Sequence, residues 1–147
     1  MVSLKIREIV EKCSQILKKE GIQSGVLDTQ LLLAHFLRKP KLFVITNPEY
    51  ELDNCEEFFK LIERRSLGEP LQYILGKSEF MSLEFSVNEH TLIPRPDTET
   101  LVESAIRRIG DTTVKFLDIG TGSGCIAISI LKYCKNAQGV ALDISRD

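Results

Sequence analysis

The sequence lacks the patterns that would build a metal site or a disulfide framework. Its four cysteines are scattered, no two of them form a Cys-x-x-Cys pair, and its two histidines do not stand at the spacing of metal ligands. We therefore expect free thiols in a reducing compartment, each serving as a small core residue. These cysteines are Cys13, Cys55, Cys125 and Cys134. The sequence predicts no metal ligand, and no residue is assigned a catalytic role.

A long apolar run and a large excess of charge are also missing. No stretch is long enough to span a bilayer, and residues 1–8 carry charges where a signal peptide has its apolar region. This pattern predicts no membrane segment and a cytoplasmic location. With 19 basic and 21 acidic residues the net charge is −2. A nucleic-acid backbone is therefore not expected as the main ligand.

Apolar residues at helical spacing dominate the chain as far as residue 66. They predict helices, and the candidate N-caps of the second and third are Ser24 and Asp53. The periodicity of residues 41–45 leaves helix and strand equally open. The predicted helices cover residues 6–17, 27–37 and 55–65. We therefore expect a small all-α domain over residues 1–66.

The pattern changes after Gly68-Glu-Pro70, which breaks the helical periodicity. Apolar residues then alternate with mostly polar ones in 71–75 and 83–87, so residues 67–96 are predicted to be an extended, hairpin-like linker. A further helix is expected after Pro94-Arg-Pro96, with Asp97 as its N-cap and Gly110 just past its end.

The segment Asp118-Ile-Gly-Thr-Gly-Ser-Gly124 carries the strongest functional signal. It follows an apolar run and precedes an apolar helical segment, which is the strand, glycine turn and helix of a nucleotide-like cofactor site. Its Gly-x-Gly-x-Gly spacing differs from the dinucleotide pattern, and Asp118 would repel a pyrophosphate but attract an ammonium or a sulfonium. Asp143 follows a second apolar run, about where a ribose-binding acid is expected. A glycine turn that serves packing alone is the alternative.

This arrangement resembles the cofactor half of a class I methyltransferase that uses S-adenosylmethionine. The predicted cofactor-binding residues are Asp118, Gly120, Thr121, Gly122, Ser123, Gly124 and Asp143.

Three motifs in order, behind a small helical domain, make the resemblance more specific. They are Gly68-Glu-Pro-Leu-Gln-Tyr-Ile-Leu-Gly76 with Phe80, Leu92-Ile-Pro-Arg-Pro-Asp-Thr-Glu99, and the glycine segment. Together they resemble the release factor glutamine methyltransferase family (HemK/PrmC). The resemblance implies methyl transfer to the side-chain amide of the glutamine in the Gly-Gly-Gln motif of peptide chain release factors. It also implies that the helical domain helps to recognise this protein substrate.

The fold class that follows is α plus α/β. We expect a small N-terminal helical bundle over 1–66, an extended hairpin-like linker over 67–96, and the first βαβ portion of a class I (Rossmann-like) methyltransferase domain over 97–147, truncated. Within the specific second motif, Arg95 is expected either to pair with an acid at the entrance of the active site or to be solvated.

One element of the family pattern is missing. Members of the family carry an Asn-Pro-Pro-Tyr motif that holds the glutamine amide, and this chain has only Asn47-Pro-Glu-Tyr50, which is predicted to be a loop of the helical domain. We therefore expect these residues to be the N-terminal part of a longer gene product and to be inactive alone. The alternatives are a methyltransferase acting on adenine amino groups of nucleic acid, and a noncatalytic protein-binding fragment.

Overall fold

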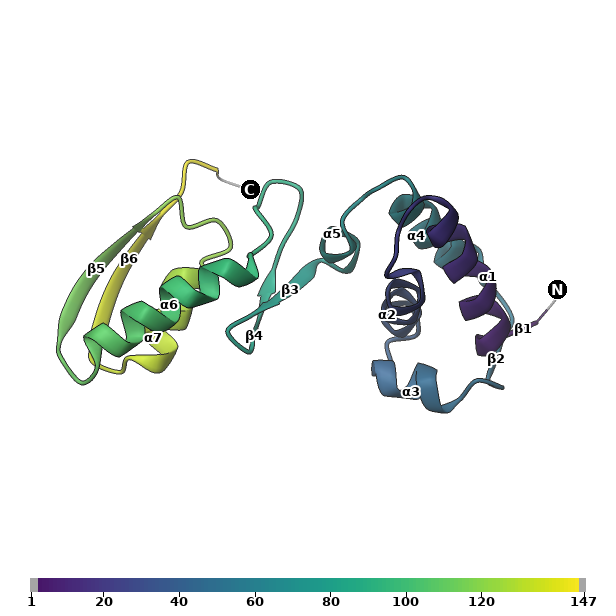
Figure 1. Cartoon of the computed structure of the whole chain (residues 1–147), viewed down its shortest axis with the longest axis horizontal. Coiled ribbons are helices and arrows are strands. Elements are labelled where there is room, and N and C mark those ends of the chain that lie inside the picture. The colour runs from purple at the N-terminus through teal and green to yellow at the C-terminus, as the bar shows by residue number, and fades with distance from the viewer. Residues whose placement is uncertain (1–2, 146–147) are drawn as a thin grey trace. The chain divides into compact units, whose positions relative to one another are not determined.

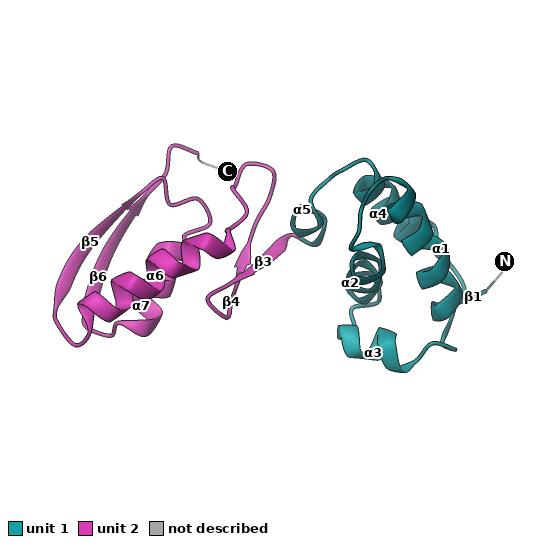
Figure 2. Ribbon diagram, in the orientation of Figure 1, with its two compact units in different colours: residues 1–75 teal, residues 76–147 magenta. Residues whose placement is uncertain are grey.

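The computed structural model describes residues 3–145 and divides into two compact units, residues 1–75 and 76–147 (Figure 2). Residues 1, 2, 146 and 147, at the ends of the first and third predicted domains, lie outside the described residues. The first unit contains β1 (Leu4–Lys5), α1 (Ile6–Lys19), α2 (Gly25–Leu37), α3 (Lys41–Thr46), β2 (Glu51–Leu52), α4 (Glu56–Ser66) and α5 (Leu71–Leu75) (Figure 1). The second contains β3 (Lys77–Phe80), β4 (Leu83–Ser86), α6 (Pro96–Ile109), β5 (Val114–Ile119), α7 (Cys125–Tyr133) and β6 (Ala137–Leu142).

The first unit is held together by one apolar stripe on each of its longer helices. In α1 the buried side chains recur every three or four residues, so they share the face that meets α2 and α4. The core residues that are at most 1% exposed are Ile6, Ile9, Cys13, Leu17, Leu32, Leu33 and Phe58. The antiparallel pair β1–β2 adds a short link in which Leu4 stands opposite Leu52. The predicted helices of this unit are confirmed.

Details at the helix ends differ from the sequence-based expectations. The segment that was open between helix and strand is α3, and the loop after it is a turn closed by Tyr50 N–H, which donates to Asn47 O at 3.1 Å. Ser24 directly precedes α2, but its side chain donates or accepts no capping hydrogen bond. At α4 the acceptor is Asn54 Oδ1, 3.2 Å from the N of Glu56. The N-cap residue of α4 is Cys55, so the expectation that Asp53 caps this helix was wrong.

Residues 71–75 correct a larger expectation, because they form the helix α5 instead of an extended segment. Pro70 starts the turn, and its carbonyl accepts from the backbone N–H of Tyr73 at 3.0 Å and of Ile74 at 3.2 Å. Ile74 is only 6% exposed, and Leu71 and Leu75 pack against the core of the first unit. Burial at positions i, i+3 and i+4 therefore outweighs the period-two alternation that suggested a strand.

The hairpin expected in the linker is present as β3 and β4. Its strands pair antiparallel from Lys77 opposite Ser86 to Phe80 opposite Leu83. The two turn residues, Met81 and Ser82, have φ values of 51° and 57°, as the primed turns of two-residue hairpins require. The next helices hold this turn in place, as the hydrogen bonds of Met81 described below show.

Strands β5 and β6 form a parallel pair connected by α7, with Leu117 opposite Val140 and Ile119 opposite Leu142. Helices α6 and α7 pack together and α7 packs on β6 (Figure 1). Helix α6 begins at Pro96 with Arg95 as its N-cap, so the expectation of a cap at Asp97 was wrong: proline suits the first helical position because it has no N–H to satisfy. Gly110 does follow the end of α6, as expected.

The two faces of this strand pair differ. On one face Phe116 packs into a core with Phe80, Phe85, Val102 and Ile130. On the other face apolar side chains remain exposed to solvent. They are Leu117, Ile119, Val140 and Leu142, with exposed fractions from 51% to 77%. A mixed architecture of helices and small sheets is thus confirmed, and the parallel pair lies where the glycine segment predicted it.

Gly139 offers a test of how tightly this pair is packed. A Cβ added there would clash with the Cζ of Phe116, its partner across the ladder, and would lie 2.8 Å from each Cε. Because the partly buried ring packs against the core and has little room to move, we expect Gly139→Ala to lower the free energy of unfolding by about 1–3 kcal/mol. Urea unfolding should show this loss, and Phe116→Leu should absorb much of it. Strictly additive effects of the two substitutions would contradict this account.

Candidate cofactor site

The candidate site lies where β5 ends and the chain turns into α7. Three glycines of this turn have positive φ: Gly120 at 74°, Gly122 at 54° and Gly124 at 77°. Residues with a side chain rarely adopt positive φ, so these three positions favour glycine. At Gly124 a Cβ would also lie 3.1 Å from Cδ1 of Ile128, within the first turns of α7. The turn can therefore bring its backbone close to a ligand.

The end of the neighbouring strand holds the loop in place. The carbonyl of Leu142 accepts two backbone hydrogen bonds, from Gly120 N–H at 2.8 Å and from Thr121 N–H at 3.0 Å. The next N–H, that of Gly122, donates to Asp143 Oδ2 at 2.7 Å. Three consecutive N–H groups of the loop thus bind the carboxyl end of β6. These hydrogen bonds connect the glycine loop and Asp143, which were predicted from the sequence as two separate parts of the site.

Asp143 is held ionised by its surroundings. Its Oδ2 accepts from Gly122 and its Oδ1 accepts from the backbone N–H of Ser145 at 2.9 Å. These hydrogen bonds, first that from Gly122 and then that from Ser145, lower the pKa of the carboxyl group below its ordinary value of 3.8. A backbone hydrogen bond from Ile144 lowers the pKa further, and the exposed carboxylate keeps at least one free lone pair. Asp143 can therefore accept hydrogen bonds from hydroxyl groups of a ligand.

Asp118 is the last but one residue of β5 and is partly buried. One of its oxygens, Oδ2, accepts a hydrogen bond from Thr121 Oγ1 at 2.7 Å. Among residues 3–145, nothing donates to its other oxygen. Thr121 therefore orients the carboxylate and leaves one oxygen for a cation or a donor of the ligand.

Ser123 is another of the predicted cofactor-binding residues. Its hydroxyl oxygen is buried and has no hydrogen-bond partner within the described part of the chain. Buried polar atoms are normally paired, and Ser129 Oγ in α7 is buried and unpaired in the same way. The Ser123 hydroxyl would have to rotate out of this position to meet a ligand. The structure thus brings the predicted residues into one loop and one strand end, while their contact with a cofactor stays a prediction.

Thr91, beside the site, and Glu99, at the β3–β4 turn, were not singled out from the sequence. A Cβ on Gly122 would lie 3.7 Å from Cγ2 of Thr91, so the segment after β4 reaches the glycine loop. Glu99 accepts the backbone N–H of Met81 at 2.7 Å, and the hydroxyl of Tyr133 donates to Met81 O at 2.8 Å. Glu99 belongs to the second motif, which was the available signal for it. That motif therefore also helps to fix the hairpin.

Other expectations concern residues away from the loop. Arg95 is exposed and forms no ion pair with any residue in 3–145, which agrees with the solvated alternative. All four cysteines are buried and free, and burial raises the pKa of the Cys13 thiol to about 11. No group of three or more metal-ligating side chains occurs in the described residues. Within the same range, no helix combines the length and apolarity that crossing a bilayer requires.

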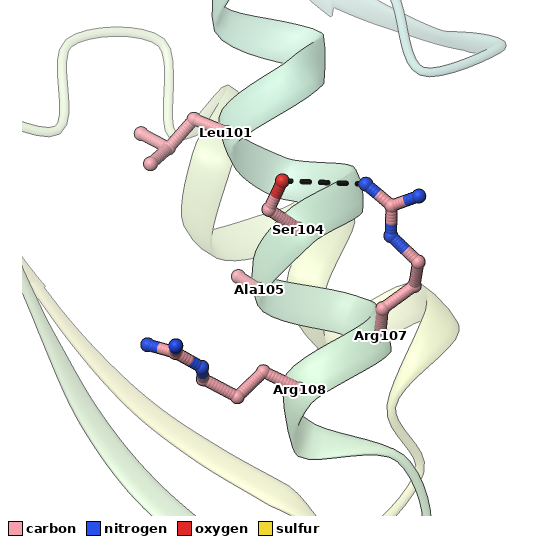
Figure 3. A pocket seen from close by; sticks show the side chains of 5 residues that line it. All are labelled: Leu101, Ser104, Ala105, Arg107 and Arg108. Carbon is pink, nitrogen blue, oxygen red and sulfur yellow. Dashed lines mark hydrogen bonds between the residues drawn. The ribbon is translucent and has the colours of Figure 1, made fainter.

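A separate hollow of about 640 Å³ runs along α6 (Figure 3). It is lined by Leu101, Ser104, Ala105, Arg107 and Arg108. In Figure 3 the guanidinium of Arg107 turns back to its own helix, where it donates to Ser104 Oγ at 3.4 Å, while Arg108 extends on the other side of α6. No residue of the glycine loop lines this hollow. It is therefore distinct from the candidate cofactor site.

Comparison with known proteins identifies relatives of both units. Residues 8–76 match the family model of the PrmC N-terminal domain. The release factor glutamine methyltransferase of Clostridium acetobutylicum is 40% identical over 147 residues, which cover 98% of this chain and 52% of the relative. That of Aliivibrio fischeri is 40% identical over 148 residues, covering 99% and 52%. A bifunctional methyltransferase of Rickettsia felis is 38% identical over 172 residues, which cover 97% of this chain and 33% of the relative.

A crystal structure also matches part of the chain. It is that of the release factor-specific protein-(glutamine-N5) methyltransferase of Alicyclobacillus acidocaldarius, with 48% identity over 43% of this chain and 40% of that one, and a TM-score of 0.33. The chain spans about half the length of the release factor glutamine methyltransferases that it matches, 52% for each of the two named above.

Over 97–99% of its length the chain is similar to proteins named as methyltransferases, and its glycine loop connects two parallel strands. Within this class, the chain is homologous to the release factor glutamine methyltransferases. The family indicated by the three sequence motifs is thereby confirmed.

Proposed function

We propose that the protein to which these residues belong transfers a methyl group from S-adenosylmethionine to the side-chain amide of the glutamine in the Gly-Gly-Gln motif of peptide chain release factors. The proposal rests on the hydrogen bonds that connect the glycine loop to the two acids at adjacent strand ends. Gly122 N–H donates to Asp143, and Thr121 Oγ1 donates to Asp118. The names of the relatives supply the substrate class.

Each group of the site has a role in this proposal. Asp143 accepts hydrogen bonds from the two ribose hydroxyls, since its oxygens point from the carboxyl end of β6 and stay ionised. The free oxygen of Asp118 attracts the ammonium of the amino-acid part. The glycine backbone lets the ligand approach, and the unpaired hydroxyl of Ser123 gains a partner once it rotates out of its buried position. When bound, the cofactor supplies a methyl group activated by a positive sulfur.

The methyl acceptor requires groups beyond these. An amide nitrogen is a poor nucleophile because its lone pair is delocalised, so acceptors must hold its NH₂ group and aim it at the methyl. No Asn-Pro-Pro-Tyr occurs in the 147 residues. We therefore place the amide-binding groups in residues outside this chain, and expect these 147 residues alone to transfer no methyl and to bind the cofactor weakly.

The exposed apolar face of the β5–β6 pair supports the same proposal. Parallel strands are normally covered on both faces, and here Leu117, Ile119, Val140 and Leu142 are half or more exposed. A longer protein would cover them with further helices. In this proposal the protein works in the cytoplasm, with release factors as its protein partners and no direct contact with nucleic acid.

The assay is methyl transfer by the full gene product that contains these residues. With labelled S-adenosylmethionine and a bacterial release factor, label should appear on the glutamine of Gly-Gly-Gln. A release factor with Gln→Glu at this position is the matched control and should stay unlabelled. Label on RNA or DNA instead of the release factor would favour the adenine amino-methyltransferase and contradict the proposal. Label transferred by the 147 residues alone would contradict the expected inactivity.

A further inference from the structure

The corner where α2 passes into α3 carries charge of one sign. Residues 29–48 contain three basic side chains, Arg38, Lys39 and Lys41, and no aspartate or glutamate. The first unit as a whole has eleven basic and eleven acidic residues, so it is neutral overall and its charges are segregated. A segregated positive patch on a neutral domain can orient a charged partner without attracting anions in general.

The backbone fixes two of these cations at the end of α2. Arg38 adopts φ 52°, in the left-handed region, and its N–H donates to His35 O at 3.1 Å, while Lys39 N–H donates to Ala34 O at 3.0 Å. Lys39 Nζ lies 5.8 Å from the centroid of the Phe43 ring. All three basic side chains are exposed, and none forms an ion pair with a residue in 3–145. Their charges are therefore available to a partner.

Apolar side chains stand next to these cations. In α3, Leu42 is 66% exposed and Ile45 is 48% exposed, while Val44 between them is 2% exposed and belongs to the core. A helix that only faced water would carry polar residues at the two exposed positions. Surfaces that bind single-stranded nucleic acid combine cations with several aromatic rings on which bases stack. The exposed apolar side chains of α3 are aliphatic, and the one exposed ring nearby, that of Tyr50, already packs edge-on against Phe43. Cations beside aliphatic side chains suit a protein surface with carboxylates and apolar groups.

We propose that this basic corner, made of Arg38, Lys39, Lys41, Leu42 and Ile45, is a docking surface for an acidic, partly apolar surface of the protein substrate. The inference rests on the proposed function, which makes the release factor the partner. The inference specifies which surface of the helical unit binds that partner, and that the binding uses opposite charges and apolar contact. The corner acts on binding and on the rate of encounter, and takes no part in methyl transfer.

The test uses the full gene product and the double variant Arg38→Gly/Lys41→Gln. Glycine suits the left-handed φ of residue 38, so this variant should fold at least as well as the original. The matched control is Lys18→Gln/Lys19→Gln, which removes the same charge from exposed lysines at the end of α1. That control site lies at the opposite end of α2, since a Cβ on Gly25 would be 3.4 Å from Cγ of Lys18.

We expect the corner variant to raise the KM for the release factor about tenfold with kcat within about twofold, and the control to change either value less than about twofold. Raising NaCl from about 50 to about 300 mM should raise the KM of the original protein more steeply than that of the variant. Calorimetry with the release factor should show the same loss of affinity, and this arm does not depend on methyl transfer.

Failure of the docking surface and failure of the proposed function give different results. An unchanged KM and affinity in the corner variant would overturn the docking surface and leave the proposed function standing. A fall in kcat at constant KM would overturn it as well, because the corner would then act on chemistry. Absence of methyl transfer by the original protein would overturn the proposed function, while calorimetry would still decide the corner. Binding of a single-stranded RNA that the corner variant loses would show that the surface serves nucleic acid and overturn the inference.

Discussion

Replacing Arg65 with methionine should lower the free energy of unfolding by about 3–5 kcal/mol, the largest stability effect expected in the helical unit. Arg65 Nε donates to Asp28 Oδ2 at 2.8 Å, and the side chains of the two residues are 17% and 4% exposed. No other described side chain pairs with the Asp28 carboxylate, so the variant would leave a buried charge without a partner. Arg65 also donates to Glu69 O at 3.0 Å, which joins α4 to the turn before α5.

The neighbouring Arg64 provides the matched control. Its ion pair with Glu69 lies at the surface, with side chains 47% and 32% exposed. Arg64→Met should therefore cost less than about 1 kcal/mol, because water screens the pair. Urea unfolding followed by far-UV circular dichroism measures both variants. The double variant Asp28→Leu/Arg65→Met should recover most of the loss. If Arg65→Met and Arg64→Met lowered the free energy of unfolding equally, the buried ion pair would be no more important for stability than the exposed one.

The ion pair between Asp28 and Arg65 also shows what one sequence leaves open. The longer helices could be predicted because their apolar stripes repeat over many residues, as in α1. The pair joins residues 37 positions apart, and no local pattern connects them. The five residues of α5 could not be predicted because they fit two periods equally well, and only the burial of Ile74 in the core decides for a helix.

The same distinction applies to the candidate site. The glycine loop could be predicted because positive φ at Gly120, Gly122 and Gly124 restricts the residue type. The two acids could be predicted from their places at strand ends. The partners within the loop could not, because rotamers and backbone hydrogen bonds decide that Thr121 binds Asp118 and that the hydroxyl of Ser123 is buried alone. The sequence therefore indicates which residues form the site, and the structure shows how hydrogen bonds connect them.

Asp143→Asn should weaken the binding of S-adenosylmethionine to the full gene product by about 30-fold or more, or about 2 kcal/mol. The carboxylate accepts from Gly122 N–H on Oδ2 and from Ser145 N–H on Oδ1. An asparagine has one oxygen, so its NH₂ group must face one of these two donors. The loop then loses its anchor or the segment after β6 shifts, and one proposed ribose contact is lost in either case.

Asp111→Asn is the matched control for this variant, since it makes the same chemical change at an exposed acid between α6 and β5 and should leave affinity within about twofold. Calorimetry measures both variants. The pH dependence adds a second check. Backbone hydrogen bonds lower the pKa of Asp143 below 3.8, so its binding form is fully present above that value and is lost only as pH falls through the lowered pKa. Affinity should therefore show no loss due to Asp143 between about pH 5 and about pH 8. If Asp143→Asn binds as tightly as the original protein, the strand end anchors the loop without holding the cofactor, and the ribose role must pass to another residue.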